Sequence, residues 1–349
     1  MILLPWMLIL VGSSLVSAQN GTTAEVPAAA DTITLANTAG RIVYDYDELN
    51  AAGVTPMTGN FFCSLWGNDT SDMDIRMLLH GYDLVHWESA DGAFELDDTV
   101  ISGFVATDDS RGNRTYTVAL YSDLYYSDGT RITAWDYAFS ILLTMSPEAA
   151  AIGGNVRRPT YLMGYEEYIS GKVPYLAGVR VMSDTQFAII VKSDYLPFFY
   201  ELGLLDCTPY PISVIAPGVR VADDGQGIYL TNIEAGGEPL FTADLLRKTI
   251  LDETTGYLTY PSVVSGPYKM VSYENGIAVF EINEQFKGDA HGMRPNIQRL
   301  SYRSLREEEM ITAYQNGTIG LINKAASSSL IRKGFQAITA NPEIGRAHV

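Results

Sequence analysis

Pairs of neighbouring carboxylates are the first candidates for chemistry in this sequence. Glu166 and Glu167 form one pair, and Asp223 and Asp224 form another. General acid and base catalysis needs two carboxylates that face one substrate, whereas adjacent side chains on a helix or strand point apart. The sequence also lacks the GxSxG, HExxH and P-loop motifs of serine hydrolases, zinc proteases and nucleotide-binding proteins. We therefore predict a protein that is not an enzyme and has no catalytic residues.

Histidines and cysteines are the second group of reactive side chains. The histidines are His80, His86, His291 and His348, and the cysteines are Cys63 and Cys207. No HxxxH or Cys-His spacing occurs, so the sequence predicts no metal site, and we expect no cofactor. In an exported protein the two cysteines could form one disulfide, and two buried free thiols are the alternative.

Composition and charge describe a folded globular protein with an acidic surface. The 349 residues are 47% hydrophobic and 18% charged, which is typical of ordered domains and allows two or three of them. The formal net charge of −18 argues against binding to nucleic acid, because a phosphate backbone is held by an excess of lysine and arginine. We expect no nucleic-acid partner and a solvated acidic exterior.

The first residues predict export. Residues 1–18 are an apolar run that ends in the small residues Val16-Ser17-Ala18, as in a secretory signal peptide. A membrane anchor is the alternative, but the run is shorter than the ~20 residues of a spanning helix, and Pro5 interrupts it. Residues 19–30 are small and polar, which predicts a flexible mature terminus.

A strand, a turn and a capped helix follow one another in the middle of the chain. The period-two alternation of Arg114–Ser122 predicts a half-buried strand. Ser127-Asp128-Gly129 is a turn sequence. Thr133 and Asp136 form a capping-box pattern for a helix that Pro147 should end. The unit contains no catalytic group, so we interpret it as structural.

Two further units have equally clear local signals. Ser265–Asn283 contains two alternating runs around Asn275-Gly276, the dipeptide most typical of a hairpin turn. Arg306–Ile322 predicts a helix that ends at Asn316-Gly317 and leads into a short strand. Short apolar runs alternate with helical segments along the chain, which predicts an α/β fold with mixed sheets.

The order of these units resembles the oligopeptide- and dipeptide-binding family (family 5) of solute-binding proteins that serve ABC importers. The motifs that carry the resemblance are Tyr126–Thr130 with Thr133-Ala134-Trp135-Asp136, Ser265-Gly266-Pro267-Tyr268-Lys269, Asn283–Gly288, and Gly317-Thr318-Ile319. One departure is Gly320, which stands where the family has an Asp. The resemblance extends from about Asp31 to about Lys324.

The resemblance implies a periplasmic-binding-protein-like fold of two lobes that close over a ligand, with an extra domain inserted in lobe I. If the family's order of segments is carried over to this chain, lobe I comprises 31–79 and 213–342, and the inserted domain comprises 80–212. Lobe II would then be largely missing, so we expect a chain truncated at its C-terminus. Residues 343–349 can be back-translated into a widely used sequencing-adapter sequence, and we expect them to be read-through.

The resemblance also implies where a ligand is held, between the lobes. The matching loops are Trp66-Gly67-Asn68-Asp69, Ile152-Gly153-Gly154 and Asn323-Lys324. Trp66 would offer a stacking face beside a strand edge that pairs with an extended ligand; a packed Trp66 followed by a helix-capping Asp69 is the alternative. The two glycines would allow close backbone approach, unless the loop is an ordinary glycine turn. Lys324 would meet a carboxylate or hydroxyl, unless it is simply solvated.

The implied function is that of the extracytoplasmic substrate-binding component of an ABC transporter. We expect it to be a monomer that captures a peptide or similar small solute and passes it to the permease and ATPase subunits of an importer. Its location would be the periplasm or the outer face of the cytoplasmic membrane. The alternative is an envelope sensor or surface binding module of the same fold without a transport role. Stacking aromatic residues suit oligosaccharides as well as peptides, so the ligand class stays open.

Overall fold

The computed structural model describes residues 47–325 and 327–340. The predicted signal peptide (1–18), flexible terminus (19–30) and adapter read-through (343–349) lie outside these residues. Two compact units emerge: one contains residues 57–296, and the other combines the segment that ends at Pro56 with the segment that starts at Ile297. The predicted division into lobe I and an inserted domain is not tested by these units and stays a prediction. Among the described residues, none of the helices has the length and apolar character to cross a membrane.

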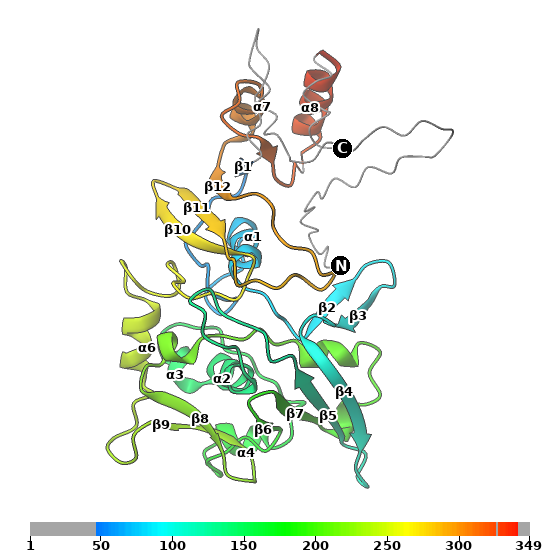
Figure 1. The fold of residues 1–349 in the computed structure, drawn as a ribbon, viewed down its shortest axis with the longest axis vertical. Coiled ribbons are helices and arrows are strands. Elements are labelled where there is room, and N and C mark those ends of the chain that lie inside the picture. Colours follow the sequence, from blue (N-terminus) through cyan, green and yellow to red (C-terminus); the bar gives the residue numbers. More distant parts are fainter. Residues whose placement is uncertain (1–46, 326, 341–349) are drawn as a thin grey trace, which may run out of the picture. The chain divides into compact units, whose positions relative to one another are not determined.

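In its described residues, the smaller unit contains three parallel strands and two helices; β1, β12, α7 and α8 are labelled in Figure 1. Strand β1 (Glu48–Gly53) pairs on one side with β12 (Arg299–Ser304) and on the other with β13 (Leu321–Ile322). The helices are α7 (Glu307–Gln315) and α8 (Ser328–Ala340). Ala52 of β1 packs with Met310, Tyr314, Ile319 and Leu330 in a small apolar core. The predicted helix and strand of Arg306–Ile322 are confirmed as α7 and β13.

The larger unit contains a four-stranded antiparallel sheet in the order β4-β5-β7-β6 (Figure 1). Its strands are β4 (Ile101–Asp108), β5 (Arg114–Leu120), β6 (Val179–Ser183) and β7 (Gln186–Val191). Burial alternates along β5, with Tyr116, Val118 and Leu120 buried, as the period-two pattern predicts.

Helix α2 (Ala134–Met145) packs against this sheet at β6. At its start, the backbone N–H of Thr133 donates to Asp136 Oδ2 over 2.8 Å, and so does the Thr133 hydroxyl. This confirms the Asp136 half of the predicted capping box. The helix ends two residues before Pro147, which instead opens the short helix α3 (Pro147–Ala151) at a position where its missing N–H costs nothing.

Three hairpins and several short helices complete the larger unit. The hairpins are β2 (Val85–Glu88) with β3 (Ala93–Leu96), β8 (Val219–Asp223) with β9 (Ile228–Asn232), and β10 (Tyr268–Glu274) with β11 (Ile277–Ile282). The helices are α1 (Thr70–Leu79), α4 (Tyr165–Ile169), α5 (Ile212–Ile215) and α6 (Ala243–Ile250), with 3-10 turns at Ser193–Tyr195 and Glu201–Leu205. In the β10–β11 turn, Asn275 and Gly276 have φ values of 52° and 72°, as the Asn-Gly dipeptide predicts.

The entry to this last hairpin is fixed against the end of α1. The backbone N–H of Gly266 donates to Leu79 O over 2.9 Å, and Asn283 Nδ2 donates to Gly266 O over 2.8 Å. A Cβ at position 266 would lie 2.5 Å from the carbonyl carbon of Leu79 and 2.6 Å from the nitrogen of His80. Both atoms belong to the backbone, so they cannot move aside as a flexible side chain would.

We therefore expect Gly266→Ala to lower the free energy of unfolding by about 1–3 kcal/mol, because the helix end must shift. Gly103→Ala in β4 is the matched control, since its Cβ would lie 3.6 Å from the Ala119 Cβ, an ordinary contact. Urea unfolding of the two variants and the parent measures both effects. An alanine at 266 that is as stable as the one at 103 would contradict the close packing.

Candidate functional site

The loop after Phe62 contains the first predicted ligand-binding residues. Trp66 is partly exposed and stacks on the buried Phe62 ring, with 5.8 Å between ring centroids and 23° between planes. Residues 64–69 do not form a strand with any other described segment, and pairing of this backbone with an extended ligand stays a prediction. Asp69 occupies the N-cap position of α1, but its side chain makes no capping hydrogen bond. Trp66 is therefore packed against the core, as in the alternative interpretation, and it remains partly exposed.

The second predicted loop, Ile152–Gly154, follows helix α3 and contacts the first. Trp66 Nε1 donates to Ile152 O over 3.4 Å, and the backbone N–H of Asn155 donates to Leu65 O over 2.8 Å. A Cβ on Gly154 would lie 2.8 Å from Ala149 O, so this glycine is required by the packing of the chain on itself. Gly153, with φ of +92°, has open space where a Cβ would be. The structure thus brings together two of the three predicted loops.

Arg76, in the last turn of α1, supports the first loop from behind. Its Nη1 donates to Gly67 O over 2.9 Å and its Nη2 donates to Asn68 Oδ1 over 3.3 Å. Burial lowers the pKa of Arg76, while the nearby Asp72 and Asp69 oppose that effect. The guanidinium still remains charged at neutral pH. Sequence reasoning missed this residue, because an arginine in a helix carries no local signal for the loop it contacts.

The third predicted loop belongs to the smaller unit. Asn323 follows β13, where its backbone N–H donates to Ala52 O over 2.7 Å and its Nδ2 donates to Tyr302 Oη over 3.3 Å. Lys324 has a φ of 55°, in the left-handed region. The Asn323 contacts hold the end of β13 against its own sheet. A ligand-binding role for Asn323 and Lys324 stays a prediction.

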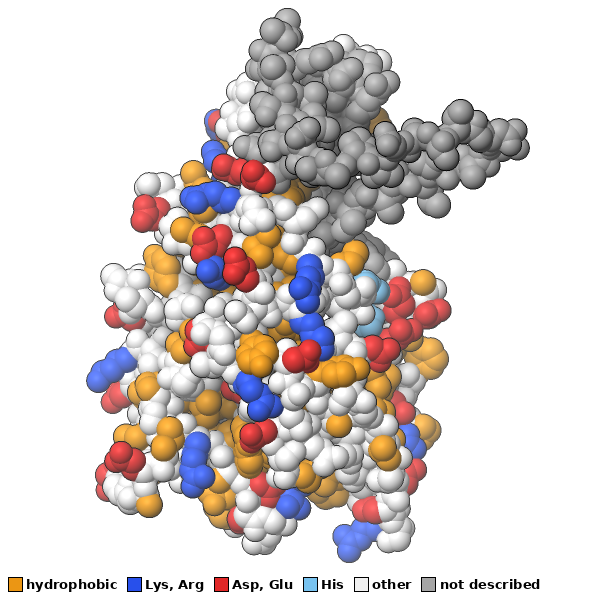
Figure 2. Space-filling model, in the orientation of Figure 1, with side chains coloured by type: hydrophobic (Ala, Val, Ile, Leu, Met, Phe, Trp, Pro, Cys, Tyr) orange, Lys and Arg blue, Asp and Glu red, His pale blue; other side chains and the backbone are white. Residues whose placement is uncertain are grey.

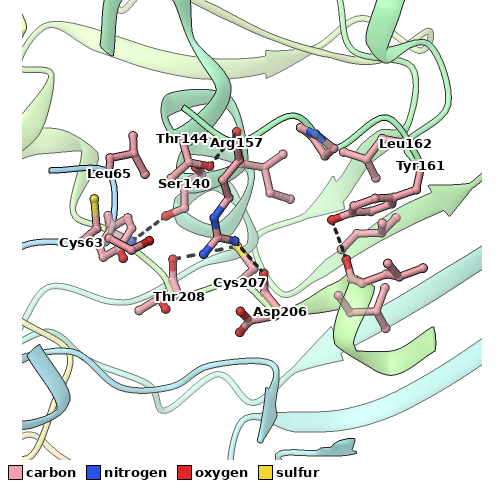
Figure 3. A pocket seen from close by; sticks show the side chains of 17 residues that line it. Cys63, Leu65, Ser140, Thr144, Arg157, Tyr161, Leu162, Asp206, Cys207 and Thr208 are labelled. Carbon is pink, nitrogen blue, oxygen red and sulfur yellow. Dashed lines mark hydrogen bonds between the residues drawn. The ribbon is translucent and has the colours of Figure 1, made fainter. Parts of the chain in front are cut away.

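A cavity of about 40 Å³ lined by both polar and apolar side chains lies in the larger unit, beside but not within the first two loops (Figure 3). Arg157 reaches into it and its Nη1 donates to Asp206 O over 3.4 Å (Figure 3). The cavity has room for an ordered water but not for a peptide. Leu65, which precedes the predicted loop, lines the cavity, whereas the predicted residues Trp66 and Ile152–Gly154 do not. We interpret this cavity as part of the folded core.

The two cysteines line this cavity as free thiols. Both are buried, and no disulfide joins them, so the alternative of two free thiols holds. Burial raises the pKa of Cys63 to about 12, and it also raises the pKa of Cys207. A thiol that stays protonated is a poor nucleophile and a poor metal ligand. The cysteines therefore contribute packing and no reactivity.

Comparison with known proteins places this arrangement in a family. The model of bacterial extracellular solute-binding proteins, family 5 Middle, matches residues 100–341. The chain is 28% identical over 123 residues to the periplasmic oligopeptide-binding protein OppA of Escherichia coli strain K12, a match that spans 35% of this chain and 22% of OppA.

Two solved structures share the fold at lower identity. Lactococcal OppA, complexed with an endogenous peptide in the closed conformation, is 17% identical with a TM-score of 0.55, covering 78% of this chain and 45% of that one. The periplasmic EDTA-binding protein EppA is 15% identical with a TM-score of 0.57, covering 84% and 46%. The chain spans less than half the length of these relatives.

These likenesses confirm the predicted α/β fold of periplasmic binding proteins. The family match covers the strand, turn and capped helix of residues 114–145, the hairpin at Asn275-Gly276 and the α7–β13 unit, which are the units that carried the resemblance. Because it extends over more than half of the sequence, the chain belongs to family 5 of the bacterial extracellular solute-binding proteins, a family of binding proteins and not of enzymes.

Proposed function

We propose that this chain is the extracytoplasmic substrate-binding component of an ABC transporter, which captures a peptide or similar small solute. The observation that carries the proposal is the junction of the two predicted loops, through Trp66 Nε1 with Ile152 O and Asn155 N with Leu65 O. The junction holds an aromatic ring, partly exposed, next to a turn with open space at Gly153. Such a surface suits a ligand with a flat or apolar group and a polar backbone.

Peptides are the ligand class that we favour for this surface. The printed names of the relatives include oligopeptide-binding proteins and one EDTA-binding protein, so the fold accommodates more than one type of solute. In this chain, Trp66 provides a stacking face, and the carbonyl of Gly67 and the side chain of Asn68 are held in place by Arg76. We propose that Trp66–Asp69, Ile152–Gly154 and Asn323-Lys324 contact the solute. The partners would be the permease and ATPase of an importer, and the location would be the periplasm or the outer face of the cytoplasmic membrane.

Trp66→Ala is expected to weaken peptide binding about tenfold, because the ligand loses its stacking surface. Isothermal calorimetry with a defined peptide mixture at about millimolar concentration measures the effect, and the thermal stability of the chain should rise with the same mixture. Trp87→Ala is the matched control: Trp87 is also partly buried, but it packs against Phe94 in the β2–β3 hairpin at 5.2 Å between ring centroids.

Two outcomes would count against this proposal. The peptide version fails if neither heat of binding nor thermal stabilisation appears with any peptide at that concentration. The assignment of Trp66 fails if peptides bind but Trp66→Ala and Trp87→Ala have equal affinity. The second outcome leaves solute capture intact and moves the site elsewhere on the chain.

A further inference from the structure

The β2–β3 hairpin has one apolar face and one face with histidine and glutamate. His86 and Glu88 are two residues apart on β2, so their side chains share a face. Glu95 of β3 lies directly opposite His86. On the other face, Trp87 contacts Phe94. The hairpin therefore presents an imidazole and two carboxylates on the side away from its aromatic contact.

A loop from a distant part of the chain adds a second imidazole to this face. His291 lies with its ring centroid 5.6 Å from that of His86, and its Nε2 is 4.0 Å from Glu88 Oε2. Asp289 Oδ1 fixes the loop by accepting from the backbone N–H of His291 over 3.0 Å and from that of Met293 over 2.9 Å. Figure 2 shows histidine side chains on the surface beside a group of acidic side chains, where Figure 1 labels β2 and β3.

Existing hydrogen bonds do not occupy every nitrogen and oxygen atom of these side chains. Glu88 Oε1 accepts from the backbone N–H of Ala90 over 3.0 Å, which orients the carboxylate and leaves Oε2 next to His291. His86 Nδ1 is buried and has no hydrogen-bond partner among the described residues. A buried polar atom without a partner is costly, and binding of a ligand to the ring would offset that cost.

Imidazole nitrogens and carboxylate oxygens are the donor set of divalent transition metals. With bonds of roughly 2.1 Å, two donors of a tetrahedral zinc site lie about 3.4 Å apart, close to the separation of His291 Nε2 and Glu88 Oε2. As the side chains stand, no three His, Cys, Asp or Glu residues in the described part of the chain are already arranged to hold a metal ion. Binding would require these side chains to rotate, and His291, whose side chain is 49% exposed, has the most room to do so, whereas the Glu88 side chain is 18% exposed.

We propose that His86 and His291, with Glu88 and Glu95, bind one divalent transition-metal ion such as Zn²⁺. The site is separate from the loops proposed to hold the solute, and it does not depend on that function. The affinities should follow the usual order of the first-row series, which favours Cu²⁺ over Ni²⁺ and Zn²⁺. Mg²⁺, which prefers oxygen ligands, should not compete.

Calorimetric titration of the full chain with Zn²⁺ at about pH 7.5 tests the proposal. We expect one ion per chain, and an affinity that falls at least about tenfold in His86→Ala and in His291→Ala. Glu88→Gln should weaken binding less, and His348→Ala, outside the described residues, should leave it unchanged. Co²⁺ bound in place of Zn²⁺ should give visible absorption bands that His291→Ala abolishes.

A change in metal binding can be told apart from a failure of a variant to fold. His291→Ala replaces an exposed loop side chain, and far-ultraviolet circular dichroism of each variant verifies the fold. The proposal is overturned if about 1 mM Zn²⁺ gives no saturable binding, or if stoichiometric binding survives in the His86→Ala, His291→Ala double variant. Binding that stays constant when the pH is lowered enough to protonate imidazole would also overturn it, since a protonated ring cannot ligate a metal.

Discussion

Phe62→Ala is expected to lower the free energy of unfolding by about 3–5 kcal/mol, the usual cost of truncating a buried aromatic side chain. Phe62 is fully buried at the centre of an aromatic cluster. Its ring meets those of Tyr210 and Tyr257 edge-on, at 4.7 and 4.9 Å between centroids, and stacks on Trp66. The substitution leaves a cavity that these rings cannot fill without leaving their own positions.

The control for this prediction is Phe199→Ala. Phe199 is 83% exposed, so its loss should change the free energy of unfolding by no more than about 0.5 kcal/mol. Urea unfolding of both variants under the same conditions gives the comparison. Equal effects at the two positions would contradict the core described here. Because Phe62 supports Trp66, peptide binding should also weaken in the Phe62 variant under conditions where it remains folded.

Asp83→Asn is expected to make the protein more stable at neutral and mildly alkaline pH. Burial, and then the charge of Asp206, raise the pKa of Asp83 from 3.8 to about 7. The Thr208 hydroxyl donates to the Asp83 carboxylate and offsets part of this effect. Between pH 3.8 and about pH 7 the folded state binds more protons than the unfolded state. The free energy of unfolding therefore falls as the pH rises through this range. An asparagine remains neutral and removes this loss.

The expected size follows from the exposure of the two carboxylates. A pKa change from 3.8 to about 7 would correspond to about 4 kcal/mol. Asp83 is only partly buried and Asp206 is exposed, so solvent weakens both the burial penalty and the repulsion, and we expect about half of that value at about pH 8. The advantage of the variant should shrink toward about pH 5.

Denaturant unfolding at several pH values measures this prediction. Asp91→Asn, in the exposed turn of the β2–β3 hairpin, controls for the removal of one negative charge from an acidic protein. The difference between Asp83→Asn and the parent should depend on pH, whereas that between Asp91→Asn and the parent should not. A constant difference for Asp83→Asn across the range would show that its carboxylate is not strained by its surroundings.

The local elements of the fold could be predicted because their causes lie within a few residues. Thr133 and Asp136 are three positions apart, and their hydrogen bonds form wherever a helix begins there. Asn275 and Gly276 adopt positive φ because asparagine tolerates the left-handed region and glycine has no Cβ to clash there. The motifs built from such elements were enough to indicate the family. The match of the family model over residues 100–341 shows that family.

The candidate site could be predicted only in part. Placing Trp66 and Ile152 near one another came from a family resemblance, and the structure supports it with the Trp66 Nε1 hydrogen bond. Whether a segment is a strand depends on a hydrogen-bonded neighbour, which local sequence does not reveal, and residues 64–69 have no such neighbour in the described part of the chain. Asp69 has a side chain typical of a cap, yet it makes no capping bond.

The sequence by itself determined the family, the α/β class, and the positions of the capped helix and the tight hairpin, because these follow from local periodicity and backbone preference. Only the tertiary structure decided that Arg76 holds Gly67 and Asn68, that Cys63 and Cys207 are separate buried thiols, and that His291 faces the β2 strand. Those contacts join segments far apart in the chain, and their geometry is set by the packing of whole elements rather than by any residue's neighbours in sequence.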